Sequence, residues 1–260
     1  MKKAVLFEVN KGVATITLNR PDRYNAVNQD LVDGISDSLK KCEQDDLIRA
    51  VVITGAGRGF CAGADLSVFA ENATAEERSQ YIIDQYQPLM NQFFSLKKPI
   101  IGAINGTAAG VGAAFALACD FRVMSNESGI LYAFVNIGLG PDGGASWLLA
   151  RQVGYSRALE IAIRGTKVSA TECLALGLSN RLVSQEALLT NAQQWAEALA
   201  ERPTLAIGIA KEDMFFAMNH SLNDTISFEA EQQVAAFKSH DLKEGVAAFL
   251  EKRTPNFLGK

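Results

Sequence analysis

The sequence predicts an α/β protein built on a parallel sheet. Short apolar runs rich in β-branched residues alternate with stretches of helical periodicity through the first half of the chain. Glycine-rich segments at residues 55–59 and 105–112 follow two of these runs, as turns between strands and helices do. From Trp147 onward the pattern becomes almost wholly helical. We therefore expect an α/β core over residues 1–200 and a helical region over residues 201–260.

The N-terminal half contains the clearest local signals. Strands over residues 5–9 and 13–18 alternate around a short Gly-containing turn and predict a hairpin. A helix over residues 29–44 follows the candidate cap Asn28, and residues 50–54 form a short buried strand. A helix over residues 74–94 begins with the capping-box pattern Thr74-Ala75-Glu76-Glu77, and Pro88 should kink it or split it in two.

Strands over residues 100–104 and 121–124 enclose a helix over residues 111–118. Helices are then expected over residues 156–164, 169–176 and 185–200 and beyond Pro203. The uncharged segment 100–119 is long enough to cross a bilayer. Its glycines, its asparagine and its change from Ile-rich to Ala-rich sequence instead favour a buried strand, a turn and a buried helix.

Composition excludes several classes of function. The chain has 260 residues, 48% of them hydrophobic, and a formal net charge of −4. An acidic balance argues against nucleic acid or an anionic membrane as a partner. The four cysteines are scattered and the chain has only two histidines, which indicates reduced thiols, no metal site and a cytoplasmic protein. The apolar stretch near the N-terminus is too short for a signal peptide.

One carboxylate lies in a tight turn, in Gly138-Leu139-Gly140-Pro141-Asp142-Gly143-Gly144. Asp142 is a candidate acid or base, and Pro-Asp-Gly also favours an Asx turn without any function. The segment Gly55-x-Gly57-x-x-Phe60 lacks the third glycine of a dinucleotide fingerprint, and a P-loop lysine is absent. Nicotinamide cofactors and P-loop chemistry are therefore not expected.

Two groups of backbone N–H donors remain, in residues 62–65 and 110–112. The second lies at an expected helix N-terminus, whose dipole favours negative charge. Two such donors meeting at one oxygen would form an oxyanion hole. The glycines could equally serve only to turn the chain, and spacing in the sequence leaves both interpretations open.

Five groups of residues occur in an order that one family shares. They are Leu18-Asn19-Arg20-Pro21 with Asn25-Ala26, Gly57-Arg58-Gly59-Phe60-Cys61-Ala62-Gly63-Ala64-Asp65-Leu66, Ala103-Ile104-Asn105-Gly106 with Ala109-Gly110-Val111-Gly112, Ile137-Gly138-Leu139-Gly140-Pro141-Asp142-Gly143-Gly144, and Glu244-Gly245-Val246-Ala247-Ala248-Phe249-Leu250-Glu251-Lys252-Arg253. Together they resemble the enoyl-CoA hydratase/isomerase, or crotonase, superfamily, nearly from end to end.

The resemblance implies a spiral of ββα units and an acyl-CoA thioester as substrate, with no cofactor besides the coenzyme A of the substrate. It implies an oxyanion hole from the backbone N–H groups of Ala64 and Val111, which would stabilise an enolate. It also implies assembly as a homotrimer or homohexamer. The residues that it assigns to substrate and CoA binding are Arg23, Ala26, Ala62, Asp65, Leu66 and Gly110.

The departures from the family pattern favour isomerisation. Hydratases of the family carry two glutamates at places where this chain has Ala114 and Phe134, and neither side chain can activate water. Asp142 matches the acid of ring-opening isomerases of phenylacetyl-CoA breakdown. Dienoyl-CoA isomerases pair this aspartate with a glutamate at the place of Phe134, and dehalogenases with an upstream histidine, so both fit less well. The alternatives kept open are an enoyl-CoA hydratase of fatty-acid or amino-acid breakdown and a non-catalytic acyl-CoA binding protein.

Other polar residues favour structural interpretations. We expect Asp65 to act through its backbone and a local turn hydrogen bond, and Asp120 to cap or pair at the start of a strand. Cys61 and Cys119 should be small buried apolar groups, and both histidines should lie at the surface. Four phenylalanines of the helical region could form an assembly surface or intrachain core: Phe215, Phe216, Phe228 and Phe237.

Overall fold

The computed structural model describes residues 3–68 and 74–260, so the first two residues of the stretch considered for a signal peptide lie outside it. Within the described residues a six-stranded sheet has the order β1-β2-β3-β4-β6-β9. Its strands are β1 (Val5–Asn10), β2 (Val13–Leu18), β3 (Ala50–Gly55), β4 (Ile100–Ile104), β6 (Phe121–Ser125) and β9 (Arg181–Val183). The predicted β1–β2 hairpin is antiparallel and all later neighbours are parallel, which confirms the α/β class.

A second, three-stranded sheet has the order β5-β7-β8. It consists of β5 (Thr107–Ala109), β7 (Gly129–Leu131) and β8 (Val168–Ser169). The sequence did not predict these strands or β9, and the expectation of an almost wholly helical chain beyond Trp147 is wrong at β8 and β9. Strands of two or three residues are too short to show an alternating pattern, and they exist because of their tertiary pairing.

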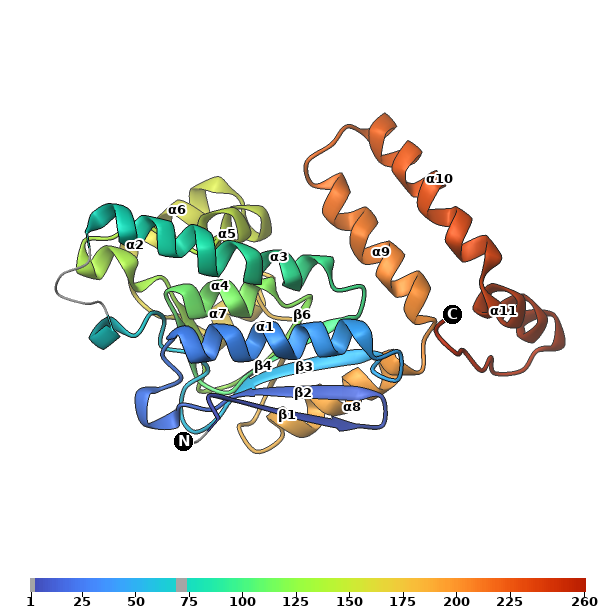
Figure 1. Ribbon diagram of the computed structural model, residues 1–260, viewed down its shortest axis with the longest axis horizontal. Coiled ribbons are helices and arrows are strands. Elements are labelled where there is room, and N and C mark those ends of the chain that lie inside the picture. Colours follow the sequence, from blue (N-terminus) through green and yellow to red (C-terminus); the bar gives the residue numbers. More distant parts are fainter. Residues whose placement is uncertain (1–2, 69–73) are drawn as a thin grey trace.

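Helices cover both faces of the larger sheet (Figure 1). Helix α1 (Gln29–Gln44) lies on one face and begins, as predicted, at Asn28, whose side chain accepts a hydrogen bond from the Leu31 N–H. Helix α8 (Leu188–Ala200) lies on the other face. It buries a row of alanines four residues apart, which lets its backbone approach the sheet closely.

The helix predicted over residues 74–94 is divided into three pieces, where Pro88 predicted a kink or a division in two. These are α2 (Ala75–Tyr81), a π-helical turn η3 (Ile82–Tyr86) and α3 (Gln87–Ser95). Thr74 and Glu77 form the predicted capping box. In the π-turn the Gln87 N–H donates to the carbonyl of Ile82, five residues back. The extra residue rotates Tyr86 relative to a continuous α-helix.

The segment considered as a membrane span folds as β4, β5 and helix α4 (Val111–Ala118), whose side chains are all buried. The change of composition therefore marks a change of element, as predicted. Among the described residues no helix has the length and apolarity needed to cross a membrane. Further along lie α5 (Ala145–Val153), α6 (Tyr155–Arg164) and α7 (Ala170–Ala175).

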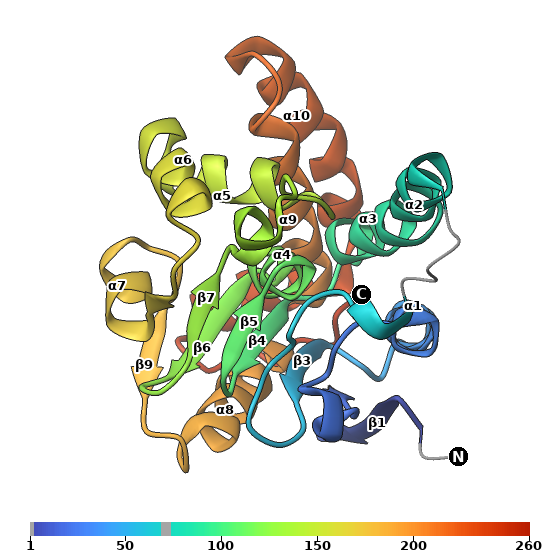
Figure 2. The ribbon, with the colours of Figure 1, turned by 90° about the vertical axis from the view of Figure 1, so that its left-hand side faces the viewer.

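The last three helices lie beside the sheet and extend away from it (Figures 1 and 2). They are α9 (Thr204–Ala217), α10 (Leu222–Lys238) and α11 (His240–Glu251). An ion pair of 2.9 Å between Lys211 and Asp120 attaches α9 to the body, and Asp120 also accepts the Ile100 N–H, the pairing role predicted for it. The division at residue 200 stays a prediction.

Candidate active site

Two buried asparagines position the loop that follows β3. The side-chain amide of Asn25 donates to the carbonyls of Gly59 and Phe60 at 2.9 and 3.1 Å. The amide of Asn105 donates to Gly57 and again to Gly59, at 3.0 and 3.2 Å. Buried carbonyls need such partners, so these two side chains fix the path of the loop that leads to residues 61–65.

A short parallel bridge orients the backbone of Ala64. The Val27 N–H donates to the carbonyl of Gly63 at 2.7 Å, and the Asp65 N–H donates to the carbonyl of Val27 at 2.9 Å. The residue between the two bonds in a parallel ladder directs its own N–H and C=O to the opposite side. The N–H of Ala64 is therefore turned away from Val27.

Val111 is the first residue of α4, so its N–H has no partner inside the helix. Gly110 precedes it with φ +53° and donates its own N–H to the carbonyl of Leu131 at 3.0 Å. Across the described residues, the N–H groups of Ala64 and Val111 donate no hydrogen bond to the protein. Both remain available to a ligand.

The structure brings the two groups of N–H donors into contact. The Ala109 N–H donates to the carbonyl of Cys61 at 2.8 Å, so the two segments run side by side. A Cβ built on Gly110 would lie 3.6 Å from the Cα of Gly63, and one built on Gly63 would lie only 2.9 Å from the carbonyl oxygen of Ala109. Glycine permits this close approach, which the sequence could not reveal.

Asp142 lies in the turn before α5, against the N-terminus of α4. A Cβ built on the next residue, Gly143, would lie 2.7 Å from Cγ2 of Val111. The Asp142 Oδ1 atom is buried without a hydrogen-bond partner among the described residues. Burial raises the pKa of Asp142 to about 6, since a desolvated carboxylate is disfavoured. Its side chain makes no Asx-turn bond there, so the purely structural interpretation is not supported.

The two places at which hydratases carry glutamates are apolar here. Ala114 lies fully buried in α4. Phe134 belongs to the 3₁₀ turn η4 (Ala133–Ile137), and its ring lies beside Gly110, 3.9 Å from a Cβ built there. Its ring also packs edge-on against Tyr132, with centroids 6.0 Å apart. Neither position therefore supplies an acid or a base.

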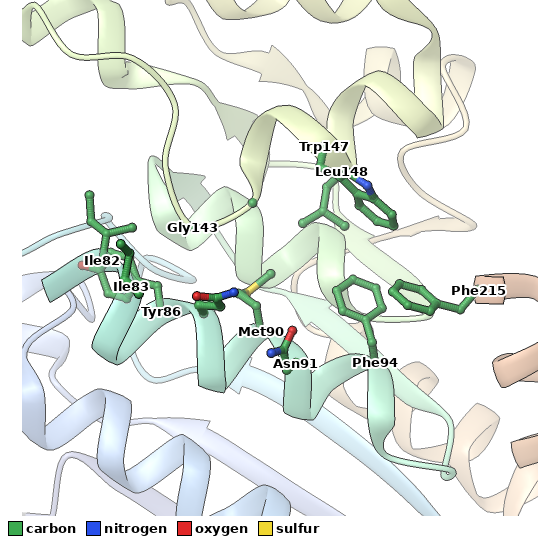
Figure 3. Close-up of a pocket in the computed structure, with 12 residues that line it drawn as sticks. Ile82, Ile83, Tyr86, Met90, Asn91, Phe94, Gly143, Trp147, Leu148 and Phe215 are labelled. Atoms are coloured by element: carbon green, nitrogen blue, oxygen red, sulfur yellow. The ribbon is translucent and has the colours of Figure 1, made fainter. Parts of the chain in front are cut away.

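An apolar cavity of about 360 Å³ adjoins the Asp142 turn. Gly143 and Gly144 form part of its wall, and Figure 3 shows Tyr86 and Trp147 on opposite sides. Three mutually packed rings close one end: Phe94 stacks on Phe215 at 4.8 Å, and Trp147 lies 5.8 and 5.7 Å from them. Because Phe215 comes from α9, the C-terminal region contributes to this cavity.

Asp65 has the local role predicted for it and a second one. Its Oδ1 accepts hydrogen bonds from the Ser67 hydroxyl and N–H at 2.6 and 3.2 Å. Its Oδ2 forms an ion pair of 2.8 Å with Arg20. The Ser67 hydroxyl and then Arg20 lower the pKa of Asp65. Arg20 also donates to the carbonyl of Ala26, and so joins the two segments assigned to CoA.

The other residues that the resemblance assigns to CoA differ in exposure. The Ala62 N–H donates to the carbonyl of Tyr24 at 2.9 Å, and Ala26 is buried. Arg23, at the end of the turn η1 (Pro21–Arg23), and Leu66 are exposed. Gly110 lies on the neighbouring segment, where a Cβ built on it would lie 3.6 Å from the Cα of Gly63.

No cysteine or histidine of the described residues lines the cavity, and the Nδ1 atom of His240 lies 3.5 Å from the Oδ1 atom of Asp241. All four cysteines are buried, and burial raises the pKa of Cys61 and of Cys119 to about 12. His220 is exposed and stacks on Phe216. The described residues contain no group of His, Cys, Asp or Glu arranged to hold a metal.

Sequence reasoning overlooked two features. Tyr86 was interpreted only as a helical apolar residue, yet it lines the cavity. The sequence also does not predict that the side-chain amides of Asn25 and Asn105 donate to the same carbonyl, that of Gly59. In the sequence, the only sign of the role of Tyr86 is Pro88, two residues later. The only sign of the role of the asparagines is that each is a polar residue next to an apolar run.

Comparison with known proteins gives a consistent result. The family model described as enoyl-CoA hydratase/isomerase matches residues 8–260. The chain is 40% identical to the 1,2-epoxyphenylacetyl-CoA isomerase of Escherichia coli (strain K12), with 100% of both chains covered. It is 35% identical to a probable enoyl-CoA hydratase of Rhodobacter capsulatus, with 98% of each covered.

Solved structures agree. The crystal structure of an enoyl-CoA hydratase from Bacillus anthracis superposes with a TM-score of 0.93 at 30% identity, covering 99% of this chain and 100% of that one. The fold is therefore the mixed α/β crotonase fold, with two sheets and a helical C-terminal region. By its sequence and by its structure, this chain belongs to the enoyl-CoA hydratase/isomerase family of acyl-CoA enzymes.

Proposed function

We propose that this protein is an acyl-CoA isomerase in which Asp142 moves a proton between carbons of the acyl group. The observation that carries the proposal is the state of Asp142, a buried carboxyl with an unpartnered oxygen and a pKa raised to about 6. A base near its working pH can both take and return a proton. A carboxyl group held only for structure would be paired.

The free N–H groups of Ala64 and Val111 supply the other half of the mechanism. When the Asp142 carboxylate removes a proton from carbon, negative charge develops on the thioester oxygen. The two N–H groups would donate hydrogen bonds to that oxygen and stabilise the charge. The contact between Gly63 and Gly110 supports this arrangement. Asp142 would then return the proton to a carbon further along the conjugated system, which shifts a double bond or rearranges a ring.

Hydration fits the site less well. Adding water requires one group to activate the water and another to protonate carbon. Ala114 and Phe134 provide neither, and the Phe134 ring would exclude water beside the oxyanion segments. Several relatives are named as hydratases, so hydration of an enoyl-CoA is the outcome that would redirect the proposal.

The cavity supports a compact, ring-bearing acyl group. An apolar cavity of about 150 Å³ accommodates benzene, and the volume here is about 360 Å³. Its aromatic end would pack edge or face against a ring. The similarity to the epoxyphenylacetyl-CoA isomerase points the same way, toward a substrate of phenylacetate breakdown.

CoA would bind along the edge formed by Ala26, Ala62, Asp65 and Leu66, with the phosphates near Arg23. We also propose assembly as a trimer or a dimer of trimers. Of the four phenylalanines considered for that surface, Phe237 is 67% exposed, while Phe215, Phe216 and Phe228 make intrachain ring contacts. Light scattering tests this, and a stable monomer at micromolar concentration would contradict it.

The proposed function is tested with three probes on one preparation. Wild-type protein should exchange the α-protons of phenylacetyl-CoA in D₂O and isomerise 3-hexenoyl-CoA, and it should hydrate crotonyl-CoA poorly. Asp142→Asn should lose about a hundredfold or more in kcat for the first two reactions and keep its CoA affinity. Robust hydration that survives in Asp142→Asn would overturn the proposal, and binding without turnover would favour a non-catalytic binder.

A further inference from the structure

Tyr86 lines the same cavity as Gly143, the residue that follows Asp142. The residue is buried to all but 4% of its surface, and its ring contacts the Asp142 turn, where a Cβ built on Gly143 would lie 3.8 Å from its Cδ2 atom. The hydroxyl makes no hydrogen bond to any described residue. Its oxygen is not one of the fully buried polar atoms that lack a partner among the described residues, so the hydroxyl keeps accessible surface and is free to donate a new hydrogen bond.

The backbone at Tyr86 is also unusual. Tyr86 ends the π-helical turn η3, and single π-turns inside helices are frequent at functional sites. Pro88 alone requires only that one helical hydrogen bond be lost. The π-turn sets the direction of the tyrosine side chain, and Figure 3 shows Tyr86 on the wall of the cavity that Gly143 also borders.

Three titratable groups affect the pKa of Tyr86. They are Tyr81 on α2, Asp142 before α5, and Cys61 beside the oxyanion segment. Burial and then these three groups raise the pKa of Tyr86, so its phenol stays protonated and can donate. Burial is the sole cause that raises the pKa of Asp142, and no lysine, arginine or histidine of the described residues contributes to either shift.

We propose that Tyr86 is a positioning residue for Asp142: its hydroxyl donates a hydrogen bond to the Asp142 carboxylate while that group is charged and awaiting a proton from substrate. The site holds an unpartnered acceptor, the Oδ1 of Asp142, in the residue before Gly143. It also holds an unpartnered donor, the hydroxyl of Tyr86, whose Cδ2 atom lies 3.8 Å from a Cβ built on Gly143. Catalytic hydrogen bonds are often long in the empty site and form when ligand closes it. No proton is transferred by Tyr86, which keeps its own throughout.

The inference rests on the proposed function of Asp142 and adds a mechanism to it. The Asp142 carboxylate takes a proton from the first carbon, carries it as a carboxylic acid, and must then face the second carbon to return it. A donor on one oxygen leaves the other oxygen free for the proton and limits rotation of the group. A hydrogen bond to the charged form also lowers the pKa of the carboxyl, so Tyr86 would keep Asp142 ionised to a lower pH than burial alone allows.

The test is the pH profile of α-proton exchange with phenylacetyl-CoA. Tyr86→Phe should lower kcat about tenfold and move the acid limb of the profile to higher pH by about one unit, because the charged Asp142 loses its donor. Tyr81→Phe is the matched control. Its ring packs edge-on against Tyr86 at 5.6 Å, yet it does not line the cavity, so its profile should match that of wild type.

A second variant keeps the test valid if Tyr86→Phe folds poorly. Replacing Tyr86 with 3-fluorotyrosine keeps ring and hydroxyl and makes the phenol a stronger donor, so the acid limb should move to lower pH. An acid limb that is unchanged in both variants, while Asp142→Asn is inactive, overturns the inference and leaves the proposed function standing. Full activity of Asp142→Asn would instead overturn the proposed function itself.

Discussion

The side chains of Asn25 and Asn105 donate hydrogen bonds to the same carbonyl oxygen, that of Gly59, at 2.9 and 3.2 Å. Asn25 lies before α1 and Asn105 lies after β4, so one buried carbonyl joins three segments that are distant in the sequence. Asn105 also accepts the Gly55 N–H at 3.0 Å. These hydrogen bonds attach the loop between β3 and residues 61–65 to the end of β4.

Asn105→Ala should destabilise the protein by about 1–3 kcal/mol, because the part-buried Gly57 carbonyl and Gly55 N–H lose the hydrogen bonds that Asn105 makes to them. Because the same loop leads to Ala64, kcat should fall as well. Urea unfolding and the exchange assay measure the two effects. Asn126→Ala, an exposed asparagine after β6, is the control and should change neither. Unaltered stability of Asn105→Ala would refute the role given to this amide.

Asp142→Asn should stabilise the folded protein at pH 8 and make no difference at pH 3. Burial raises the pKa of Asp142 from 3.8 to about 6 in the folded state. Between those two values the folded protein binds more protons than the unfolded chain, so its stability falls as pH rises through this window. Above pH 6 the wild type carries the full penalty of a buried charge, and asparagine removes it. Thermal unfolding at the two pH values gives the comparison.

Phe215→Ala should relax selectivity for the acyl group. The Phe215 ring stacks on Phe94 and closes the cavity from α9. Its removal should raise the ratio of kcat/KM for a longer acyl-CoA over a shorter one on the order of tenfold, the scale at which apolar pockets discriminate. Met214→Ala changes the neighbouring residue on the same helix, which is 72% exposed, and should leave the ratio unchanged. If Phe215→Ala and Met214→Ala give the same ratio of kcat/KM, the acyl group does not contact Phe215.

Coenzyme A thioesters should bind and nicotinamide cofactors should not. The dinucleotide fingerprint is incomplete after β3, where Phe60 is found at the place of the third glycine. Calorimetry should show CoA affinity that weakens with salt, as contacts of basic residues with phosphates do, and Arg23→Ala should reduce that dependence. Tight binding of NADH without binding of CoA would be incompatible with the assigned edge.

The sequence by itself determined the elements whose signal is local. The hairpin of β1 and β2, the start of α1 at Asn28 and the capping box of Thr74 follow from turn and cap chemistry that a few adjacent residues specify. The motifs were sufficient for the family, because several ordered segments together are far more specific than any one. They also placed a lone carboxylate at Asp142 and apolar residues at Ala114 and Phe134.

Only the tertiary structure decided what depends on contacts between distant segments. The strands β5, β7, β8 and β9 are too short to have a pattern of their own and exist through pairing. The contact of Gly63 with Gly110, the burial that raises the pKa of Asp142, and the approach of Tyr86 and Phe215 to one cavity all join residues separated by tens of positions. The pattern of apolar and polar residues along a chain indicates which residues are buried. Desolvation of a carboxyl group and proximity between distant residues arise only when the chain is packed. The proposed chemistry of this site depends on that desolvation and that proximity.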